Sequence, residues 1–203
     1  MDEHYFSADP AVPFRRTPVR AEVWGRTLDL TSGSGVFAQG RLDVGTAVLF
    51  RETAPPEGRR FLDLGCGYGV IGLALAATVP GSVVRAVDVN ERAVLLANQN
   101  AASLGVADRF AAVTPRQVPP DEEYDEIWSN PPIRIGKDAL HALLLGWLPR
   151  LAPQGRAVLV VGRNLGADSL QRWLAGEGWP TERLASAKGF RVLETRRGGV
   201  NQG

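Results

Sequence analysis

Several features are scarce in this sequence, and each scarcity excludes a class of protein. The chain of 203 residues has one cysteine, Cys66, so an intramolecular disulfide cannot form, which fits a reducing cytoplasm. No apolar run approaches the ~20 residues that span a bilayer, and residues 1–20 lack the apolar core of a signal peptide. The histidines, His4 and His141, are too few and too far apart for a metal site. We therefore expect a cytoplasmic protein without a membrane segment or a metal ion.

An excess of charge is also missing, because the formal net charge is +1. A balance this even does not indicate a nucleic-acid binder, so any surface for nucleic acid would have to be local. Hydrophobic residues make up 44% of the chain and charged residues 22%. This composition is typical of a globular protein, and the length allows one α/β domain with a full core and a modest extension.

The first part of the chain, residues 1–56, is expected to be an extension that packs on the core and covers the substrate side. Pro10, Pro13 and Pro18 exclude a regular helix, so residues 1–20 are expected to be irregular. A strand at 27–31 and a short amphipathic segment at 44–51 follow. The break at 54–58 marks the start of a core that covers residues 57–197, and residues 198–203 are expected to be a loose tail.

Strands and helices alternate through the core. The pattern predicts helices at 70–78, 91–104, 138–151 and 167–175. It predicts strands at 60–64, 83–87, 110–113, 126–129, 157–161, 183–186 and 190–195. Alternating β and α units imply a mostly parallel sheet that is covered on both faces, and the last two strands would form an antiparallel hairpin. The fold class is therefore α/β, with a doubly wound, seven-stranded sheet.

The glycine turn, residues 65–69, joins an expected strand to an expected helix. Gly65, Gly67 and Gly69 stand at alternate positions, where glycine tolerates positive φ and lets a ligand approach the backbone. The helix that follows offers free N–H groups and a positive dipole end. Asp63, at the end of the strand, can accept hydrogen bonds from a ligand's ammonium or from turn amides. A tight turn without a ligand is the alternative, but three such glycines cost backbone entropy in any ordered turn.

Residues 67–72 also match G-x-G-x-x-G, the pattern of dinucleotide-binding turns, and that match alone is a weak signal. Two features favour S-adenosylmethionine (SAM) over a nicotinamide cofactor. Asp63 stands two residues before an extra glycine, Gly65, as in SAM sites, and the chain has no second substrate domain of the kind that most dehydrogenases carry.

Asp88 ends the next expected strand, 25 residues after Asp63. A carboxylate at that place can accept from both ribose hydroxyls of a nucleoside. The alternative is that Asp88 caps the following helix, but Asn90 is better placed as the N-cap of Glu91. We therefore expect Asp88 to be free for a ligand.

The Asn130 turn, Asn130-Pro131-Pro132-Ile133, follows another expected strand and carries the chemistry. An exocyclic amine on a base, or an amide nitrogen, is a poor nucleophile because its lone pair is delocalised. The Asn130 side-chain carbonyl and the Pro131 backbone carbonyl can accept its two N–H bonds and direct the lone pair at a methyl sulfonium. Pro132 stiffens the turn and keeps Pro131 extended. Catalysis would then rest on positioning and hydrogen bonding, without a strong general base; the alternative is a strand end broken by prolines.

Together these motifs resemble those of class I SAM-dependent methyltransferases, within the small-domain group that contains ribosomal RNA guanine-N2 methyltransferases. The resemblance rests on segments 4–6, 34–37, 43–46, 63–72, 98–100, 130–137 and 189–193. It implies a Rossmann-like methyltransferase sheet, SAM as methyl donor, and a guanine amine in the RNA of the small ribosomal subunit as acceptor. Asn130, Pro131 and Pro132 would face the acceptor. The residues that would bind the cofactor are Asp63, Gly65, Cys66, Gly67, Tyr68, Gly69, Asp88, Val89, Thr114 and Asn130.

Two departures from the family pattern stand out. Many relatives carry an acid just after the third core strand, where it meets the adenine amine, whereas this chain has Thr114 and Gln117 in that region. Many amine methyltransferases also have an aromatic residue after the two prolines, and here Ile133 gives only apolar contact. Stacking on the target base could come instead from the N-terminal segment, although burial is the commoner fate of aromatic side chains. The candidates are Tyr5, Phe6, Phe14 and Phe37.

Basic residues gather locally, and RNA phosphates would suit them. We expect Arg134 and Lys137, beside the Asn130 turn, to bind substrate; ordinary solvated charge is the alternative, favoured for Arg196 and Arg197. The other cations are Arg15, Arg16, Arg20, Lys188 and Arg191.

Two other functions stay open. The same turn suits methylation of a protein glutamine or a DNA adenine. The missing acid near Thr114 also permits a SAM-binding RNA-interaction module without turnover.

Overall fold

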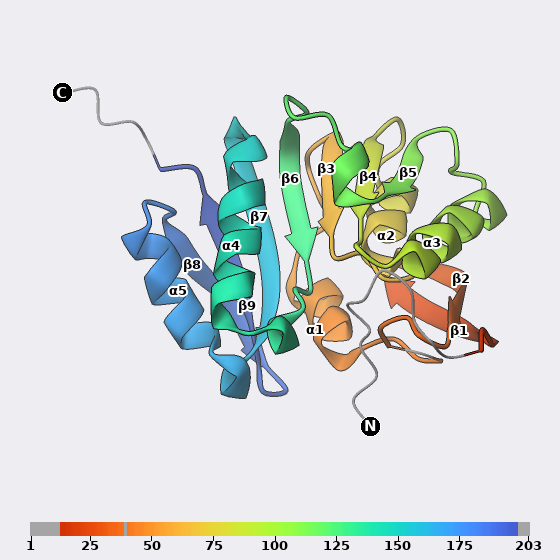
Figure 1. Ribbon diagram of the computed structural model, residues 1–203, viewed down its shortest axis with the longest axis horizontal. Helices are drawn as coiled ribbons and strands as arrows, with labels where there is room; N and C mark the ends of the chain where they lie inside the picture. Colours follow the sequence, from red (N-terminus) through yellow and green to blue (C-terminus); the bar gives the residue numbers. More distant parts are fainter. Residues whose placement is uncertain (1–12, 39, 199–203) are drawn as a thin grey trace.

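The computed structural model describes residues 13–38 and 40–198 (Figure 1). The expectations for His4, Tyr5 and Phe6 lie outside the described residues. The main sheet has seven strands in the spatial order β5-β4-β3-β6-β7-β9-β8. They are β3 (Arg60–Leu64), β4 (Val83–Val87), β5 (Phe110–Val113), β6 (Tyr124–Ser129), β7 (Leu151–Gly162), β8 (Thr181–Ala187) and β9 (Phe190–Arg196).

The sheet confirms the predicted doubly wound, mostly parallel architecture. Strands β3 to β7 run parallel to one another, whereas β9 pairs antiparallel with both β7 and β8. The strand order reverses at β3, which has β4 on one side and β6 on the other. In open α/β sheets, ligands bind beyond the carboxyl ends of the strands at such a reversal. This edge is the lower one in Figure 1, where the arrows of β3 and β6 end.

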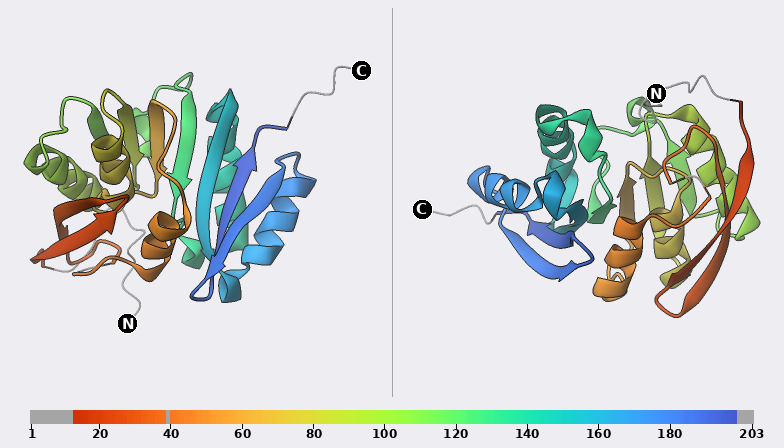
Figure 2. Two further views of the ribbon diagram at one scale, coloured as in Figure 1. Left: turned by 180° about the vertical axis from the view of Figure 1, so that it is seen from behind. Right: turned by 90° about the horizontal axis from the view of Figure 1, so that it is seen from below.

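Helices cover both faces of the sheet (Figure 2). One face packs against α1 (Val44–Glu52), α2 (Val70–Thr78) and α3 (Glu91–Ser103) in a core that includes Phe61 and Trp128. The other face packs against α4 (Lys137–Trp147) and α5 (Ala167–Gly176) in a second core that includes Leu62 and Ile127. Because successive side chains of a strand point to opposite faces, β3 and β6 each supply apolar side chains to both cores.

The N-terminal segment differs from the expectation of an irregular chain up to residue 20. Strand β1 (Arg16–Val23) pairs antiparallel with β2 (Arg26–Gly33) in a separate two-stranded sheet. Pro18 excludes a helix but not this strand, because each strand of a two-stranded sheet has an open edge where no N–H is needed. Val19 and Ala21 of β1 are buried in the core formed with α2 and α3.

The prediction of a helix at 138–151 is wrong at its C-terminal end. Helix α4 stops at Trp147, a 3₁₀ turn covers Leu148–Arg150, and β7 already starts at Leu151. Pro149 has no N–H to continue the α-helical hydrogen bonds, which explains the early stop. The strand expected at 157–161 is wrong at its start, because β7 already begins at Leu151. Pro153 and Gly155, which are unfavourable inside strands, lie in the part that was missed. The remaining expected helices and strands agree with the structure to within about two residues at each end.

Candidate functional site

A pocket lies at the carboxyl edge of the sheet, where β3, β6 and the start of α1 meet. Its lining combines the glycine turn, Asn130 of the Asn130 turn, and residues before or within the first turn of α1. The lining residues are Phe37, Ala38, Asp43, Thr46, Gly65, Cys66, Gly67, Tyr68, Val70, Ile71 and Asn130. The structure therefore brings the two motifs singled out in the sequence to one site.

Pairing between β3 and β6 makes the two turns neighbours. The strands run parallel, with Asp63 opposite Trp128, so both chains leave the sheet at the same edge. The hydroxyl of Ser129 donates a hydrogen bond of 2.6 Å to the carbonyl oxygen of Leu64. A Cβ atom on Gly65 would stand 3.6 Å from Cδ of Pro132, an ordinary contact distance. The glycine turn thus packs directly beside the second proline of the Asn130 turn.

The glycine turn has the backbone conformation that its sequence predicts. The φ angles of Gly65, Gly67 and Gly69 are 74°, 54° and 89°, all in the region that favours glycine. The amides of Gly65 and Cys66 both donate to the carbonyl oxygen of Val87 in β4, at 2.8 and 3.0 Å. A Cβ atom on Gly67 would meet no other atom within 4 Å, so this side of the turn is open.

Asp63 lies beneath the glycine turn and does not line the pocket. Its side chain is fully buried, Oδ2 accepts the amide N–H of Gly72 at 2.7 Å, and Oδ1 has no partner among the described residues. Burial, together with a smaller effect of the Asp88 carboxylate, raises the pKa of Asp63 to about 7, against the opposing effect of the Gly72 N–H. Asp63 is therefore an isolated buried carboxylate whose charge is costly near neutral pH.

Asp88 follows β4, beside the glycine turn. Asn90 is the N-cap of α3, as predicted, and accepts from the amides of Arg92 and Ala93 at 3.0 and 3.4 Å. The expectation that this leaves Asp88 free is wrong, because its Oδ2 accepts the Gly67 N–H and its Oδ1 accepts the Asn90 N–H, both at 2.9 Å. The carboxylate is mostly buried, and burial raises its pKa.

Asn130 is held by two residues that sequence reasoning missed as site residues. Its Nδ2 atom donates to Oδ2 of Asp43 at 2.7 Å and to Oγ1 of Thr46 at 3.0 Å. The Pro131 carbonyl, expected to accept from a substrate, already accepts the Ile133 N–H at 2.8 Å. With Pro132 at φ −74° and ψ 77°, this is an inverse γ-turn. A carbonyl oxygen has a second lone pair, so the Pro131 oxygen keeps capacity for one more donor.

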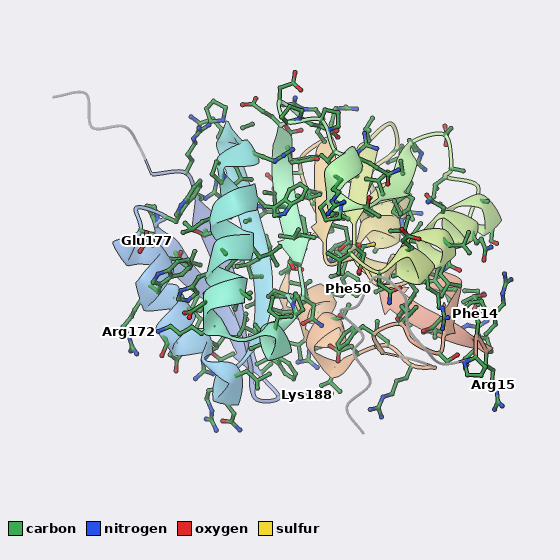
Figure 3. The ribbon with its side chains drawn as sticks, viewed as in Figure 1. Phe14, Arg15, Phe50, Arg172, Glu177 and Lys188 are labelled. Atoms are coloured by element: carbon green, nitrogen blue, oxygen red, sulfur yellow. The ribbon has the colours of Figure 1, made fainter. Side chains whose placement is uncertain are left out.

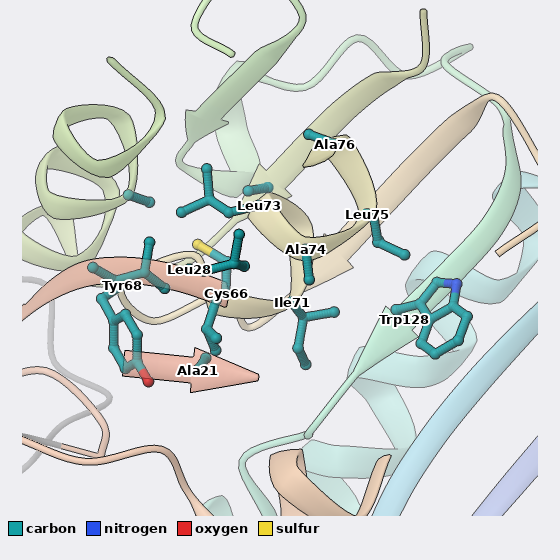
Figure 4. Close-up of a cluster of buried hydrophobic side chains, with 14 of the residues drawn as sticks. Ala21, Leu28, Cys66, Tyr68, Ile71, Leu73, Ala74, Leu75, Ala76 and Trp128 are labelled. Atoms are coloured by element: carbon teal, nitrogen blue, oxygen red, sulfur yellow. The ribbon is translucent and has the colours of Figure 1, made fainter. Parts of the chain in front are cut away.

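Two predicted cofactor residues, Cys66 and Tyr68, line the pocket but have buried side chains. They are 5% and 2% exposed, and Figure 4 shows both near the strand that carries Ala21. The Tyr68 hydroxyl has no partner among the described residues, and burial raises the pKa of both the Tyr68 phenol and the Cys66 thiol.

The other predicted cofactor residues, Val89 and Thr114, lie outside the pocket lining. Val89 follows β4 and is exposed, whereas Thr114 follows β5. Gln117 accepts from both the amide and the hydroxyl of Thr114, at 2.9 and 3.0 Å. Because β5, β4 and β3 are adjacent, these residues continue along the carboxyl edge from the glycine turn.

The predicted substrate residues lie around the Asn130 turn to different degrees. Phe37 lines the pocket and is 41% exposed, so it can contact a ligand. Ile133 and Arg134 belong to the 3₁₀ turn Ile133–Ile135, and Lys137 begins α4. Ile133 and Lys137 do not line the pocket. Phe14 precedes β1 and does not line the pocket, and the guanidinium of Arg92 stands 5.4 Å from its ring centroid.

Several of the expected RNA-binding cations have protein partners. Arg20 pairs with Asp29 at 2.7 Å, and Arg191 pairs with Asp168 at 3.3 Å. Lys188 lies in the turn between β8 and β9, near α1 in Figure 3. Within residues 13–38 and 40–198, no group of three or more His, Cys, Asp or Glu side chains could hold a metal ion. No helix in the same ranges has the length and apolar character needed to cross a membrane.

Comparison with known proteins gives a consistent family match. The family described as methyltransferase small domain matches residues 27–194. The chain is 32% identical to the uncharacterized protein YbxB of Bacillus subtilis, over 97% of this chain and 100% of that protein. It is 34% identical to ribosomal RNA small subunit methyltransferase C of Pseudomonas aeruginosa, over 84% of this chain and 51% of that protein. The chain thus spans about half the length of the latter relative.

A solved structure shares the fold. The T. thermophilus 16S rRNA N2 G1207 methyltransferase (RsmC), in complex with AdoMet and guanosine, superposes with a TM-score of 0.79 at 24% identity. The match covers 93% of this chain and 52% of that chain.

Proposed function

The chain belongs to the methyltransferase small domain family, a family of SAM-dependent methyltransferases, and from this premise we propose that it methylates the exocyclic N2 amine of a guanine in small-subunit ribosomal RNA. The named acceptor is that of the T. thermophilus relative. The partner is then ribosomal RNA or the small ribosomal subunit, and a cytoplasmic location is part of the proposal. Residues 1–56 serve as the substrate-side cover of the core at 57–197.

The glycine turn fits a nucleoside cofactor. Its open side at Gly67 leaves room for a ligand against the backbone, since a Cβ there would meet nothing within 4 Å. Asp88 follows β4 beside this turn, and each carboxylate oxygen has a further lone pair that can accept from a ribose hydroxyl. Thr114 and Val89 extend the cradle along the sheet edge. When bound, SAM supplies a methyl group on a sulfonium sulfur.

The main support for the proposed acceptor is the Asn130 side-chain amide. Both Asn130 amide hydrogens have protein acceptors, so Oδ1 is left as an acceptor at the pocket that the glycine turn also lines. An amine there can donate one N–H to Asn130 Oδ1 and the other to the Pro131 carbonyl. These two bonds orient the nitrogen lone pair and make it less delocalised, and fixed acceptors of this kind need no reorganisation during the reaction.

Phe37 and the cations near the Asn130 turn complete the acceptor side. Phe37 offers an exposed ring within the pocket lining. Ile133 is the last residue of the Asn130 turn, and Arg134 and Lys137 follow the turn. A base that reaches Asn130 from a folded RNA helix must be flipped out of its stack. We therefore assign Phe37 and Ile133 to contacts with the base, and Arg134 and Lys137 to phosphates.

The experiment is transfer of a tritiated methyl group from SAM to a panel of substrates. The panel contains deproteinised ribosomal RNA, intact small ribosomal subunits, DNA and a protein extract. Asn130→Ala should lower the rate by about 10²- to 10³-fold and leave SAM affinity nearly unchanged. The matched control is Asn164→Ala, because Asn164 is an exposed asparagine after β7 that does not line the pocket.

Each result of the panel decides one part of the proposal. Label in RNA or subunits that is lost in Asn130→Ala, with N2-methylguanine in the digest, supports the whole assignment. Label confined to DNA or protein overturns the guanine acceptor and leaves the roles of the two turns intact. Binding of SAM without label in any substrate overturns catalysis by the isolated chain.

A further inference from the structure

We infer that Asp43 and Thr46 are positioning residues that fix the Asn130 side-chain amide in one orientation, with Oδ1 toward the pocket. The inference rests on the proposed function, because it explains how Asn130 accepts from the methylated amine. Asp43 precedes α1 and Thr46 lies in its first turn, 87 and 84 residues before Asn130. They belong to the N-terminal segment rather than to either motif at the centre of the sheet.

The contacts leave the amide one favourable orientation. Nδ2 of Asn130 donates to Oδ2 of Asp43 at 2.7 Å and to Oγ1 of Thr46 at 3.0 Å, which uses both amide hydrogens. An ionised carboxylate only accepts hydrogen bonds. If the amide turned by 180°, its oxygen would face the Asp43 carboxylate and both bonds to Nδ2 would be lost. An asparagine without such partners could present either its oxygen or its NH₂ group to a substrate.

The fold holds both partners in place. Asp43 is the N-cap of α1, and the same Oδ2 atom accepts the Thr46 amide N–H at 3.0 Å. Thr46 is 3% exposed, so water does not compete for its hydroxyl. The first turn of α1 also packs tightly on β9, since a Cβ atom on Gly45 would stand 2.8 Å from the ring of Phe190. Packing of α1 against the sheet therefore sets the orientation of the amide.

Substitutions at Asp43 can separate this role from helix capping. Asparagine and serine both cap helices well, so neither Asp43→Asn nor Asp43→Ser should unfold α1. In Asp43→Asn, the side-chain oxygen can still cap the helix and accept from Asn130. In Asp43→Ser, the shorter hydroxyl caps the helix but can also donate to the Asn130 oxygen, so it no longer excludes the turned amide. We expect kcat to fall about 10- to 100-fold in Asp43→Ser, with KM for SAM within about twofold.

Thr46 provides a second, independent pair of variants. Thr46→Val keeps the shape and removes the acceptor, and it should lower kcat by about 3- to 10-fold. Thr46→Ser keeps the hydroxyl and should recover most of that loss, as Asp43→Asn should relative to Asp43→Ser. The matched control is Asp138→Ser, because Asp138 is an exposed acid in the first turn of α4 at the same edge of the sheet.

The deciding measurement is a double-mutant cycle with Asn130→Ala. If Asp43 acts through Asn130, Asp43→Ser should lower kcat in the wild-type background and change it little in the Asn130→Ala background. A further loss of similar size in the Asn130→Ala background would overturn the inference. Wild-type kcat in Asp43→Ser with unchanged thermal stability would overturn it as well.

An NMR readout tests the amide without any methyl transfer. The two Nδ2 protons of Asn130, assigned by their loss in Asn130→Ala, should be well separated and exchange slowly in the wild type. They should exchange faster in Asp43→Ser and Thr46→Val and stay protected in Asp43→Asn. If no substrate is methylated but these signals behave as described, the proposed function fails and the fixed amide stands. Unprotected Nδ2 protons in the wild type would overturn the fixed amide by itself.

Discussion

The two turns of the site are held by different parts of the chain. The amides of the glycine turn donate their hydrogen bonds to Val87 and Asp88 at the end of the adjacent strand, about 20 residues on. Asn130 donates its hydrogen bonds to Asp43 and Thr46, more than 80 residues away. The cofactor side is thus a property of one β-α-β unit, whereas the acceptor side depends on how the N-terminal segment packs on the sheet.

Asn100 qualifies this contrast, because its side chain links the glycine turn to the N-terminal hairpin formed by β1 and β2. Its Nδ2 donates to the carbonyl oxygens of Thr31 and Tyr68 at 2.8 and 2.9 Å, and its Oδ1 accepts the Thr31 N–H at 2.8 Å. Asn98, two positions earlier, makes an equivalent pair of bonds with Ala112 of β5. Both asparagines lie in a segment that carries the family resemblance, but their partners could not be read from the sequence.

Crowding at the glycine turn should give Gly69→Ala the largest cost in stability. A Cβ atom at Gly69 would stand 2.9 Å from Cβ and 3.2 Å from Cα of Ala97, and φ is 89°. Steric overlap and left-handed strain together should cost about 3–4 kcal/mol of unfolding free energy, measured by urea denaturation. Gly105→Ala is the matched control, since φ is 68° there and nothing lies within 4 Å. Its cost should be about 1 kcal/mol; equal costs would contradict the role of helix α3 in shaping the glycine turn.

A change of pH should alter the stability of the protein through Asp63, beneath the glycine turn, and not through the Asn130 amide, which is neutral. The pKa of Asp63 is about 7 in the folded chain, compared with its ordinary value of 3.8. Between these values the folded state retains the proton that the unfolded state releases, so stability falls as pH rises from about 4 to about 7. Asp63→Asn should remove this dependence. Relative to wild type, the variant should gain roughly 2–3 kcal/mol between pH 5 and pH 8, by urea unfolding at both values. Parallel pH curves for the two proteins would show that Asp63 has an ordinary pKa.

Removing the Asn100 side chain, which links the glycine turn to the β1–β2 hairpin, should have a smaller effect on the free energy of unfolding and a local effect on dynamics. Asn100 is 3% exposed, and Asn100→Ala would leave the Thr31 and Tyr68 backbone groups unpaired. We expect a loss of about 2 kcal/mol and faster hydrogen exchange in β2 and the glycine turn. Asn98→Ala is the control and should speed exchange in β5 instead. Identical exchange patterns in the two variants would contradict a specific link through Asn100.

The smallest effect is expected where a local contact is weakened but not removed. Asp88→Asn replaces one of the two carboxylate oxygens that accept from Gly67 and Asn90, so only one of these amides keeps its acceptor. If Asp88 also binds the ribose, SAM affinity should fall about tenfold, or about 1.4 kcal/mol, by isothermal titration calorimetry. Asn130→Ala in the same experiment should leave SAM affinity nearly unchanged, which sharpens the division between the two turns. A loss of SAM affinity in Asn130→Ala as large as in Asp88→Asn would contradict the division of roles between the two turns.

Much of the fold could be predicted because its signals are local. Glycines at alternate positions after an apolar strand predicted the glycine turn, and the helix from Val70 to Thr78 was predicted at both ends. Strand β1 was missed because the prolines that exclude a helix led to an expectation of irregular structure up to residue 20, whereas an open strand edge needs no N–H at Pro18. The end of α4 was missed because the apolar pattern continues through Pro149 into β7.

Local sequence patterns were sufficient to predict the alternation of strands and helices, the glycine turn and the position of Asn130 after a buried strand. These follow from periodicity and from the conformational preferences of glycine and proline, which act within a few residues. Tertiary packing was needed to establish which side chains accept from the Asn130 amide and which backbone amides donate to the Asp88 carboxylate. In the sequence, Asp43 stands just before the amphipathic segment expected at 44–51, and nothing near it indicates a contact with Asn130. Their 2.7 Å contact exists because α1 packs on β7 and β9 beside the end of β6, and packing between distant segments leaves no local pattern.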